Sequence, residues 1–220
     1  MTALDSGPSI IRINSTYATL LAGRIRDSNS DRKTVTDALV AVGFELGRTI
    51  TELLPTESAP IITPMNERID AVVVPEEWNL VVTTKQDCGT LGYALRCAVG
   101  GAYSGYIDFG RRRGQDVLQS PVREICFPAA LPPIGTVIVG KTVLATGCTA
   151  ISLVRLALER TRAKRLVVAT AFYSMEAISE LCAAFNSVIV VCIGDPDQLD
   201  ENGMLRPGVG IIEERVFDGR

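Results

Sequence analysis

The feature that most constrains the fold is one stretch near the middle of the chain, residues 136–158. A largely β-branched run over 136–144 leads into Ala145–Thr149, and apolar positions follow at 151, 154 and 158. The run is typical of a buried strand, and the spacing of the apolar positions is typical of a helix. The stretch therefore predicts a strand, a tight loop and a helix. Backbone N–H groups and the partial positive charge at such a helix start can hold a phosphate, although an ordinary strand-to-helix turn stays open as an alternative.

Composition limits what the chain can do. With 220 residues, 47% of them hydrophobic, the chain can bury one sizeable core. A net charge of −3 gives no reason to expect nucleic acid or a membrane surface as a partner. The sequence has no histidine, which removes the commonest general base and metal ligand. Six cysteines without a CxxC spacing suggest reduced thiols in a cytoplasm, and we expect neither a signal peptide nor a membrane-spanning run.

The order of the predicted elements indicates an α/β fold. Helices are predicted over residues 15–30 and 31–54, the second ended by Pro55. Beyond the central strand, the helix predicted over 174–185 lies between strand candidates at 166–171 and 188–193. Alternating strands and helices predict a parallel sheet with right-handed crossovers, and such sheets bind ligands at the carboxyl ends of their strands. The earlier strand candidates are 61–62, 71–74 and 80–84.

Three parts of the sequence resemble one protein family. The loop LATGCT at 144–149 resembles the 5-phosphate loop of uracil phosphoribosyltransferases, a family with the type I phosphoribosyltransferase fold. The segment LDENGMLRPGVGIIEERVFDG at 199–219 resembles the uracil-binding end of that family, and Arg26-Asp27 resembles part of its N-terminal helical region. The resemblance implies a single domain over 1–220. It places an N-terminal helical arm at 1–55 and an α/β core, a parallel sheet flanked by helices, at 56–220.

The resemblance also assigns binding roles to two loops. Ala145, Thr146, Gly147, Cys148 and Thr149 would hold the 5-phosphate of phosphoribosyl pyrophosphate (PRPP). Cys148 stands where the family usually has glycine. A thiol near a helix start is pushed toward thiolate, so Cys148 is either a nucleophile or oxidation-sensitive group, or only a tolerated small side chain.

The base-binding residues implied by the resemblance are Gly208, Val209, Gly210 and Ile211. The family's Asp-Ala-Gly-Asp after the second glycine is replaced by residues 211–214, Ile-Ile-Glu-Glu, which makes the expected base pocket more apolar. Arg215 and Phe217 match the family.

The sequence departs from the family where ribose and pyrophosphate would bind. Carboxylates before the Ala-Thr-Gly accept hydrogen bonds from ribose hydroxyls in the family, and Lys141 and Thr142 stand there instead. Lys141 either contacts an anionic ligand or is solvated or paired with Asp195 or Asp197. The family's pyrophosphate-binding arginine is also missing.

Two groups of cations could compensate for that missing arginine. Lys85 or Gln86 falls at its place, and a lysine offers a point charge where arginine offers a planar fork. Arg111–Arg113 beside Gly114 either close over an anionic ligand or form a solvated loop. We predict Lys85, Lys141 and Arg112 as catalytic residues.

The resemblance implies an enzyme that transfers the phosphoribosyl group of PRPP to a pyrimidine-like base, as in pyrimidine salvage. Two alternatives stay open because fold does not fix function. One is a repurposed member that acts on another phosphate or carboxylate substrate in a specialised biosynthetic pathway, and the other is a non-catalytic ligand sensor. No metal ligands are predicted in the chain, and Mg²⁺ bound with PRPP stays open. We expect a homodimer from the resemblance and from the apolar face of residues 17–25, which has no obvious partner within a single sheet.

Overall fold

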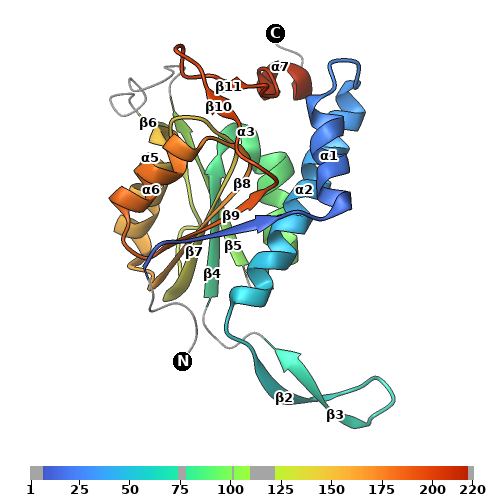
Figure 1. Cartoon of the computed structure of the whole chain (residues 1–220). Helices are drawn as coiled ribbons and strands as arrows, with labels where there is room; N and C mark the ends of the chain where they lie inside the picture. The colour runs from blue at the N-terminus through green and yellow to red at the C-terminus, as the bar shows by residue number, and fades with distance from the viewer. Residues whose placement is uncertain (1–6, 74–77, 101, 110–121, 218–220) are drawn as a thin grey trace.

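The centre of the molecule is a seven-stranded sheet, seen in a computed structural model that describes residues 7–73, 78–100, 102–109 and 122–217 (Figure 1). The strand order is β1-β9-β8-β7-β4-β5-β6, and every neighbouring pair is parallel except β5–β6. The strands are β1 (Ser9–Ile13), β4 (Trp78–Thr84), β5 (Ala102–Phe109), β6 (Val122–Cys126), β7 (Ile134–Leu144), β8 (Arg165–Tyr173) and β9 (Val188–Ile193).

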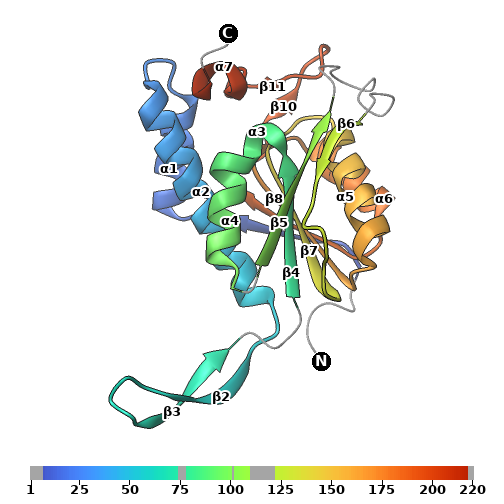
Figure 2. The same ribbon diagram turned by 180° about the vertical axis from the view of Figure 1, so that it is seen from behind.

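Helices cover both faces of this sheet (Figures 1 and 2). One face carries α5 (Cys148–Thr161) and α6 (Met175–Ala184), and the other carries α1 (Thr16–Arg26), α2 (Arg32–Leu53) and α4 (Tyr93–Ala98). The short helix α3 (Lys85–Asp87) and the π-helical turn η1 (Cys88–Gly92) connect β4 to α4. The predicted class, a parallel sheet flanked by helices, is confirmed. No helix in the described ranges is long and apolar enough to cross a membrane.

Strand β4 shows how the two cores are built. Its side chains alternate, so that Leu80 and Val82 pack in the core under α5 and α6, whereas Val81 packs in the core under α1, α2 and α4. Because both faces are covered, the central strands are continuous apolar runs, which is typical of a parallel sheet. Each fully buried valine or leucine contributes roughly 1.5–3 kcal/mol to folding.

The N-terminal helices begin where the sequence predicts. Ser15 Oγ accepts a hydrogen bond from Ala18 N at 3.0 Å at the start of α1, and Asp31 Oδ1 accepts one from Thr34 N at 2.7 Å at the start of α2. Such caps stabilise a helix by about 1 kcal/mol each. Helix α1 ends at Arg26, so the last four residues of the predicted helix 15–30 lie outside it.

The apolar face of α1 has a partner within the chain, which corrects one expectation. Ala18, Leu21 and Ile25 are buried in the core that α1 shares with α2 and the sheet. Of the large apolar side chains on this helix, Tyr17 and Leu20 stay about half exposed. The face formed by residues 17–25 therefore does not by itself call for a second copy of the chain.

Several strands lie where the sequence pattern is weak or absent. The candidates 61–62 and 71–74 fall in a separate antiparallel hairpin, β2 (Glu57–Ile62) with β3 (Arg68–Val73), which projects from the body in Figure 1; residue 74 lies outside the described ranges. Strand β1 was not predicted, and it pairs with β9 at the edge of the sheet. The C-terminal segment contains β10 (Gln198–Leu199), β11 (Leu205–Arg206) and α7 (Ile212–Val216), and it crosses the carboxyl edge of the sheet.

Candidate functional site

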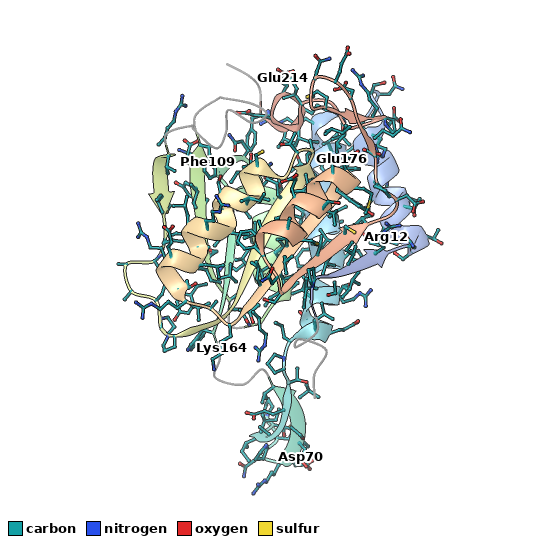
Figure 3. The ribbon with its side chains drawn as sticks, turned by 60° about the vertical axis from the view of Figure 1, so that its left-hand side comes forward. Arg12, Asp70, Phe109, Lys164, Glu176 and Glu214 are labelled. Carbon is teal, nitrogen blue, oxygen red and sulfur yellow. The ribbon has the colours of Figure 1, made fainter. Side chains whose placement is uncertain are left out.

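A pocket of about 280 Å³ opens at the carboxyl edge of the sheet, between the end of β7, the turn after β4 and the C-terminal segment. In Figure 3, Glu214 marks this end of the molecule, and Lys164 lies at the opposite end of the sheet, above the hairpin that carries Asp70. Ligands of parallel sheets bind at this edge. The lining residues are Gln86, Asp87, Thr90, Lys141, Thr142, Val143, Met204, Gly210, Ile211, Ile212, Glu213, Val216 and Phe217.

The polar floor of the pocket is organised by Asp87, a residue that the sequence did not single out. Lys141 Nζ donates to Asp87 Oδ2 at 2.8 Å, and Thr142 Oγ1 donates to Asp87 Oδ1 at 2.6 Å. Thr84 Oγ1 donates to Oδ2 at 2.7 Å. The Asp87 side chain is 5% exposed and that of Lys141 20%. Asp195 and Asp197, the partners considered for Lys141, pair instead with arginines on other elements.

Asp87 contacts Lys141 and Thr142 of β7 because the neighbouring strand β4 ends before β7 does. The ladder between β4 and β7 ends at the pair Thr83 and Gly140, so the last residues of β7 run past the end of β4. The turn after β4 fills this place, and Thr142 N lies 3.4 Å from Asp87 Oδ1. The carboxylate therefore takes the position of the missing strand neighbour.

Asp87 stays ionised although it is buried. Burial alone would raise the pKa of this carboxyl, but the positive charge of Lys141 and the hydrogen bonds from Lys141, Thr142 and Thr84 outweigh it and hold the pKa below its ordinary value. The pattern Thr84-x-x-Asp87 at a helix start resembles a capping box, a hydroxyl residue followed three positions later by an acid. That pattern was the one signal in the sequence that could have drawn attention to Asp87.

The predicted phosphate loop lies at the end of the same strand as Lys141. Gly147 adopts φ +80°, and α5 begins at the next residue. The N–H groups of the first helical turn have no partners within the helix and can bind an anion. Ser174 Oγ fixes the loop by donating to Ala145 O at 2.6 Å, and Thr146 lies beside Gly203 of the C-terminal segment. Cys148 Sγ is 4.0 Å from Thr146 O.

Lys85 lies at the same edge but is not among the residues that line the pocket. Its Nζ donates to Glu124 Oε2 at 2.8 Å and is 3.7 Å from Asp108 Oδ2. Tyr106 OH donates to the other oxygen of Glu124 at 3.0 Å. The hydrogen bond with Glu124 raises the pKa of Lys85, whose side chain is half exposed. Arg112 and its neighbours lie outside the described residues.

Two arginines fasten the predicted base-binding segment to α1. Arg26 donates to Gly208 O at 2.9 Å and to both carboxylate oxygens of Asp197. Arg215 donates to the backbone oxygens of Ile25 and Val209, and at 2.7 Å to that of Asp27. Of the predicted base-binding residues, only Gly210 and Ile211 line the pocket, while the carbonyls of Gly208 and Val209 are occupied by these arginines. No pattern in the sequence indicates the contact between Arg26 and Asp197.

One edge of the sheet thus carries the predicted phosphate loop, the paired Lys141 and a mostly apolar C-terminal wall. In the described ranges, no three His, Cys, Asp or Glu side chains gather as metal ligands. The chain is 28% identical over 198 residues to the uracil phosphoribosyltransferase of Natronomonas pharaonis, a match that covers 88% of this chain and 89% of that protein.

Solved structures show the same fold. A protein from Aquifex aeolicus superposes with a TM-score of 0.81 at 20% identity, over 96% of this chain and 98% of its own. The adenine phosphoribosyl transferase of Trypanosoma brucei superposes with a TM-score of 0.51 at 8% identity, over 81% and 80% of the two chains. The sequence model of uracil phosphoribosyltransferases matches residues 13–219, nearly the whole chain. The chain therefore belongs to the uracil phosphoribosyltransferase family.

Proposed function

We propose that the chain is a phosphoribosyltransferase that transfers the phosphoribosyl group of PRPP to a pyrimidine-like base. The observation that carries this proposal is the shared pocket of Lys141 with Gly210 and Ile211, at the end of the strand that leads into the phosphate loop. PRPP and a pyrimidine-like base together present a phosphate, a sugar and a ring. Groups that bind these three parts are needed in that order along the carboxyl edge of the sheet. Membership of the family supports the same activity.

The predicted phosphate loop and the pocket would each bind one part of the two substrates. The backbone of Ala145–Thr149 would hold the 5-phosphate at the start of α5. Gly210 and Ile211 would meet the ring of the base, with Phe217 and Ile212 supplying an apolar wall. Catalysis by this set of groups is mostly positioning and electrostatic stabilisation.

The reaction breaks the bond between ribose C1 and the pyrophosphate oxygen, and pyrophosphate leaves with the electron pair. A ring nitrogen of the base forms the new bond to C1 and loses its proton to solvent. A divalent ion that arrives with PRPP belongs to the substrate in this scheme.

Calorimetric titration with PRPP and with uracil separately, followed by a pyrophosphate-release assay, tests the proposal. We expect PRPP binding, and pyrophosphate release that depends on uracil or a related pyrimidine. PRPP bound but never consumed would favour a ligand sensor. No PRPP binding, together with binding of another phosphate or carboxylate compound, would favour the repurposed enzyme.

We also propose that the protein is a cytoplasmic homodimer. All six cysteines are free thiols, as expected in a reducing compartment.

The proposed dimer would cover apolar side chains of the projecting β2–β3 hairpin. Ile62 is 64%, Val72 77% and Met65 82% exposed there. Light scattering at micromolar concentration should give twice the chain mass, and a monomer would contradict the proposal.

A further inference from the structure

We infer that Lys141, held in place by Asp87, is the cation that binds the leaving pyrophosphate of PRPP. The inference rests on the proposed function and deepens it, since it names the residue that receives the charge of the leaving group. The sequence favours Lys85 for pyrophosphate. The contacts of Lys85 and Lys141 in the structure differ, and they show which of the two can receive a polyanion.

Lys85 forms ion pairs with two carboxylates outside the pocket. Glu124 and Asp108 both lie within ion-pair distance of its ammonium group, at 2.8 and 3.7 Å. A pyrophosphate at Lys85 would have to displace or sit beside two carboxylates of like charge, which costs binding energy. Lys85 is thus poorly placed to receive a polyanion.

Lys141 lines the pocket, and its ammonium group has N–H donors that are not used within the described ranges. An ammonium group has three N–H donors, and in the described part of the chain a single hydrogen bond is found for Lys141, the one to Asp87 at 2.8 Å. Its side chain lines the pocket and is 20% exposed. The remaining N–H groups can meet oxygens of a ligand.

Glu213 lines the same pocket and Asp87 offsets part of the charge of Lys141, but the carboxylate of Asp87 is satisfied within the protein. Its carboxylate is the more deeply buried partner, 5% exposed, and hydrogen bonds from Thr84, Thr142 and Lys141 occupy both of its oxygens. Both residues line the pocket, and the lysine is the more exposed partner of the pair. Asp87 acts as a positioning residue: it keeps the lysine side chain oriented, and it keeps the pair stable when the pocket is empty.

The order of the two groups along β7 also suits PRPP, which carries phosphates on both sides of its ribose. Lys141 lies four residues before Ala145, about 13 Å along the strand at roughly 3.3 Å per residue. The 5-phosphate would bind at the loop and the pyrophosphate near Lys141, with the ribose between them. As the C1–O bond breaks, the electron pair moves to the pyrophosphate oxygen, and the ammonium group of Lys141 donates a hydrogen bond there without giving up its proton.

Titration with pyrophosphate alone tests the inference, because it needs no turnover. Removal of one hydrogen bond between charged groups should weaken pyrophosphate binding by about 10- to 100-fold in Lys141→Met, which keeps the apolar stem of the side chain. Since that change leaves Asp87 unpaired, the double variant Asp87→Asn/Lys141→Met provides a neutral pair that should fold and show the same loss. Lys164→Ala, at the opposite end of the sheet, is the matched control and should bind as the parent does (Figure 3).

The outcomes separate this inference from the proposed function. Unchanged pyrophosphate binding in the folded double variant would overturn the inference, as would a loss in Lys85→Ala that exceeds the loss in Lys141→Met. If the unmodified protein releases no pyrophosphate from PRPP with any pyrimidine, the proposed function fails, yet the titration still decides whether Lys141 binds pyrophosphate. In an active enzyme, Lys141→Met should raise KM for PRPP and leave the Kd of the pyrimidine unchanged.

Discussion

Arg26 binds both carboxylate oxygens of Asp197, at 3.0 and 2.8 Å, although the two residues are 171 positions apart in the sequence. The same guanidinium donates to Gly208 O and lies 4.7 Å from the centre of the Phe172 ring. One side chain of α1 thus joins the loop after β9 to the segment that reaches the pocket. The shape of the predicted base-binding segment therefore depends on a helix that lines no part of the pocket.

Replacing this arginine should destabilise the protein and loosen the base-binding segment. In Arg26→Ala the Asp197 side chain, 4% exposed, loses its partner, and breaking such a buried pair costs about 3–5 kcal/mol of unfolding free energy. Arg26→Lys should recover only part of this loss because lysine lacks the planar fork. Urea unfolding measures the effect, with the exposed Arg24→Ala on the same helix as the control; equal stability of the two alanine variants would contradict the prediction.

Acid should reveal the contribution of Asp87 to stability. Its folded pKa lies below the unfolded value of about 3.9, so its contribution is complete above that pH and is lost as the pH falls through the folded pKa. Asp87→Asn should therefore lower the unfolding free energy at pH 7, by about 3–5 kcal/mol for a broken buried pair. The difference from the parent should narrow below about pH 4. Urea midpoints at pH 7 and pH 3.5 measure both values, and a constant difference would refute this account.

Gly147 is required by the backbone of the phosphate loop. At φ +80° a side chain is strained, and a Cβ there would lie 3.1 Å from Ala177 O. Gly147→Ala should cost about 1–2 kcal/mol of stability and weaken phosphate binding by calorimetry. Gly23→Ala is the matched control, because Gly23 lies within α1 with open space around it and the change should stabilise the helix by about 0.5–1 kcal/mol. The two substitutions should therefore move the unfolding free energy in opposite directions, and a gain at Gly147 would show that the loop does not need glycine.

Local patterns in the sequence were enough to predict the central strands and the strand, loop and helix around Gly147. The strand, loop and helix around Gly147 follow one another along the chain, so composition and spacing reveal them directly. The hairpin was harder, because a strand signal at 61–62 does not say whether the strand joins the main sheet. Strand β1 has only five residues, too few for a clear period.

The contacts that organise the site could not be read from the sequence. Lys141 and Asp87 are 54 positions apart, and they meet because β4 ends earlier than β7. No local pattern states where one strand stops relative to its neighbour. For the same reason the sequence suggested Asp195 and Asp197 as partners of Lys141, and these two carboxylates are taken by Arg12 and Arg26.

Restoring the acid of the family at position 141 should fail while Asp87 is present. In Lys141→Asp two carboxylates would share the place of an ion pair, and like charges in a buried site destabilise each other. The substitution should lower the unfolding free energy by more than Lys141→Met does. Adding Asp87→Asn should recover part of the loss, with a coupling of about 0.5–3 kcal/mol in a double-mutant cycle measured by urea unfolding. Additive effects on the unfolding free energy would show that the two positions act independently. Coupling would mean that Lys141→Asp is tolerated only together with Asp87→Asn. A return to the family's acid at position 141 would then also require the loss of the Asp87 carboxylate.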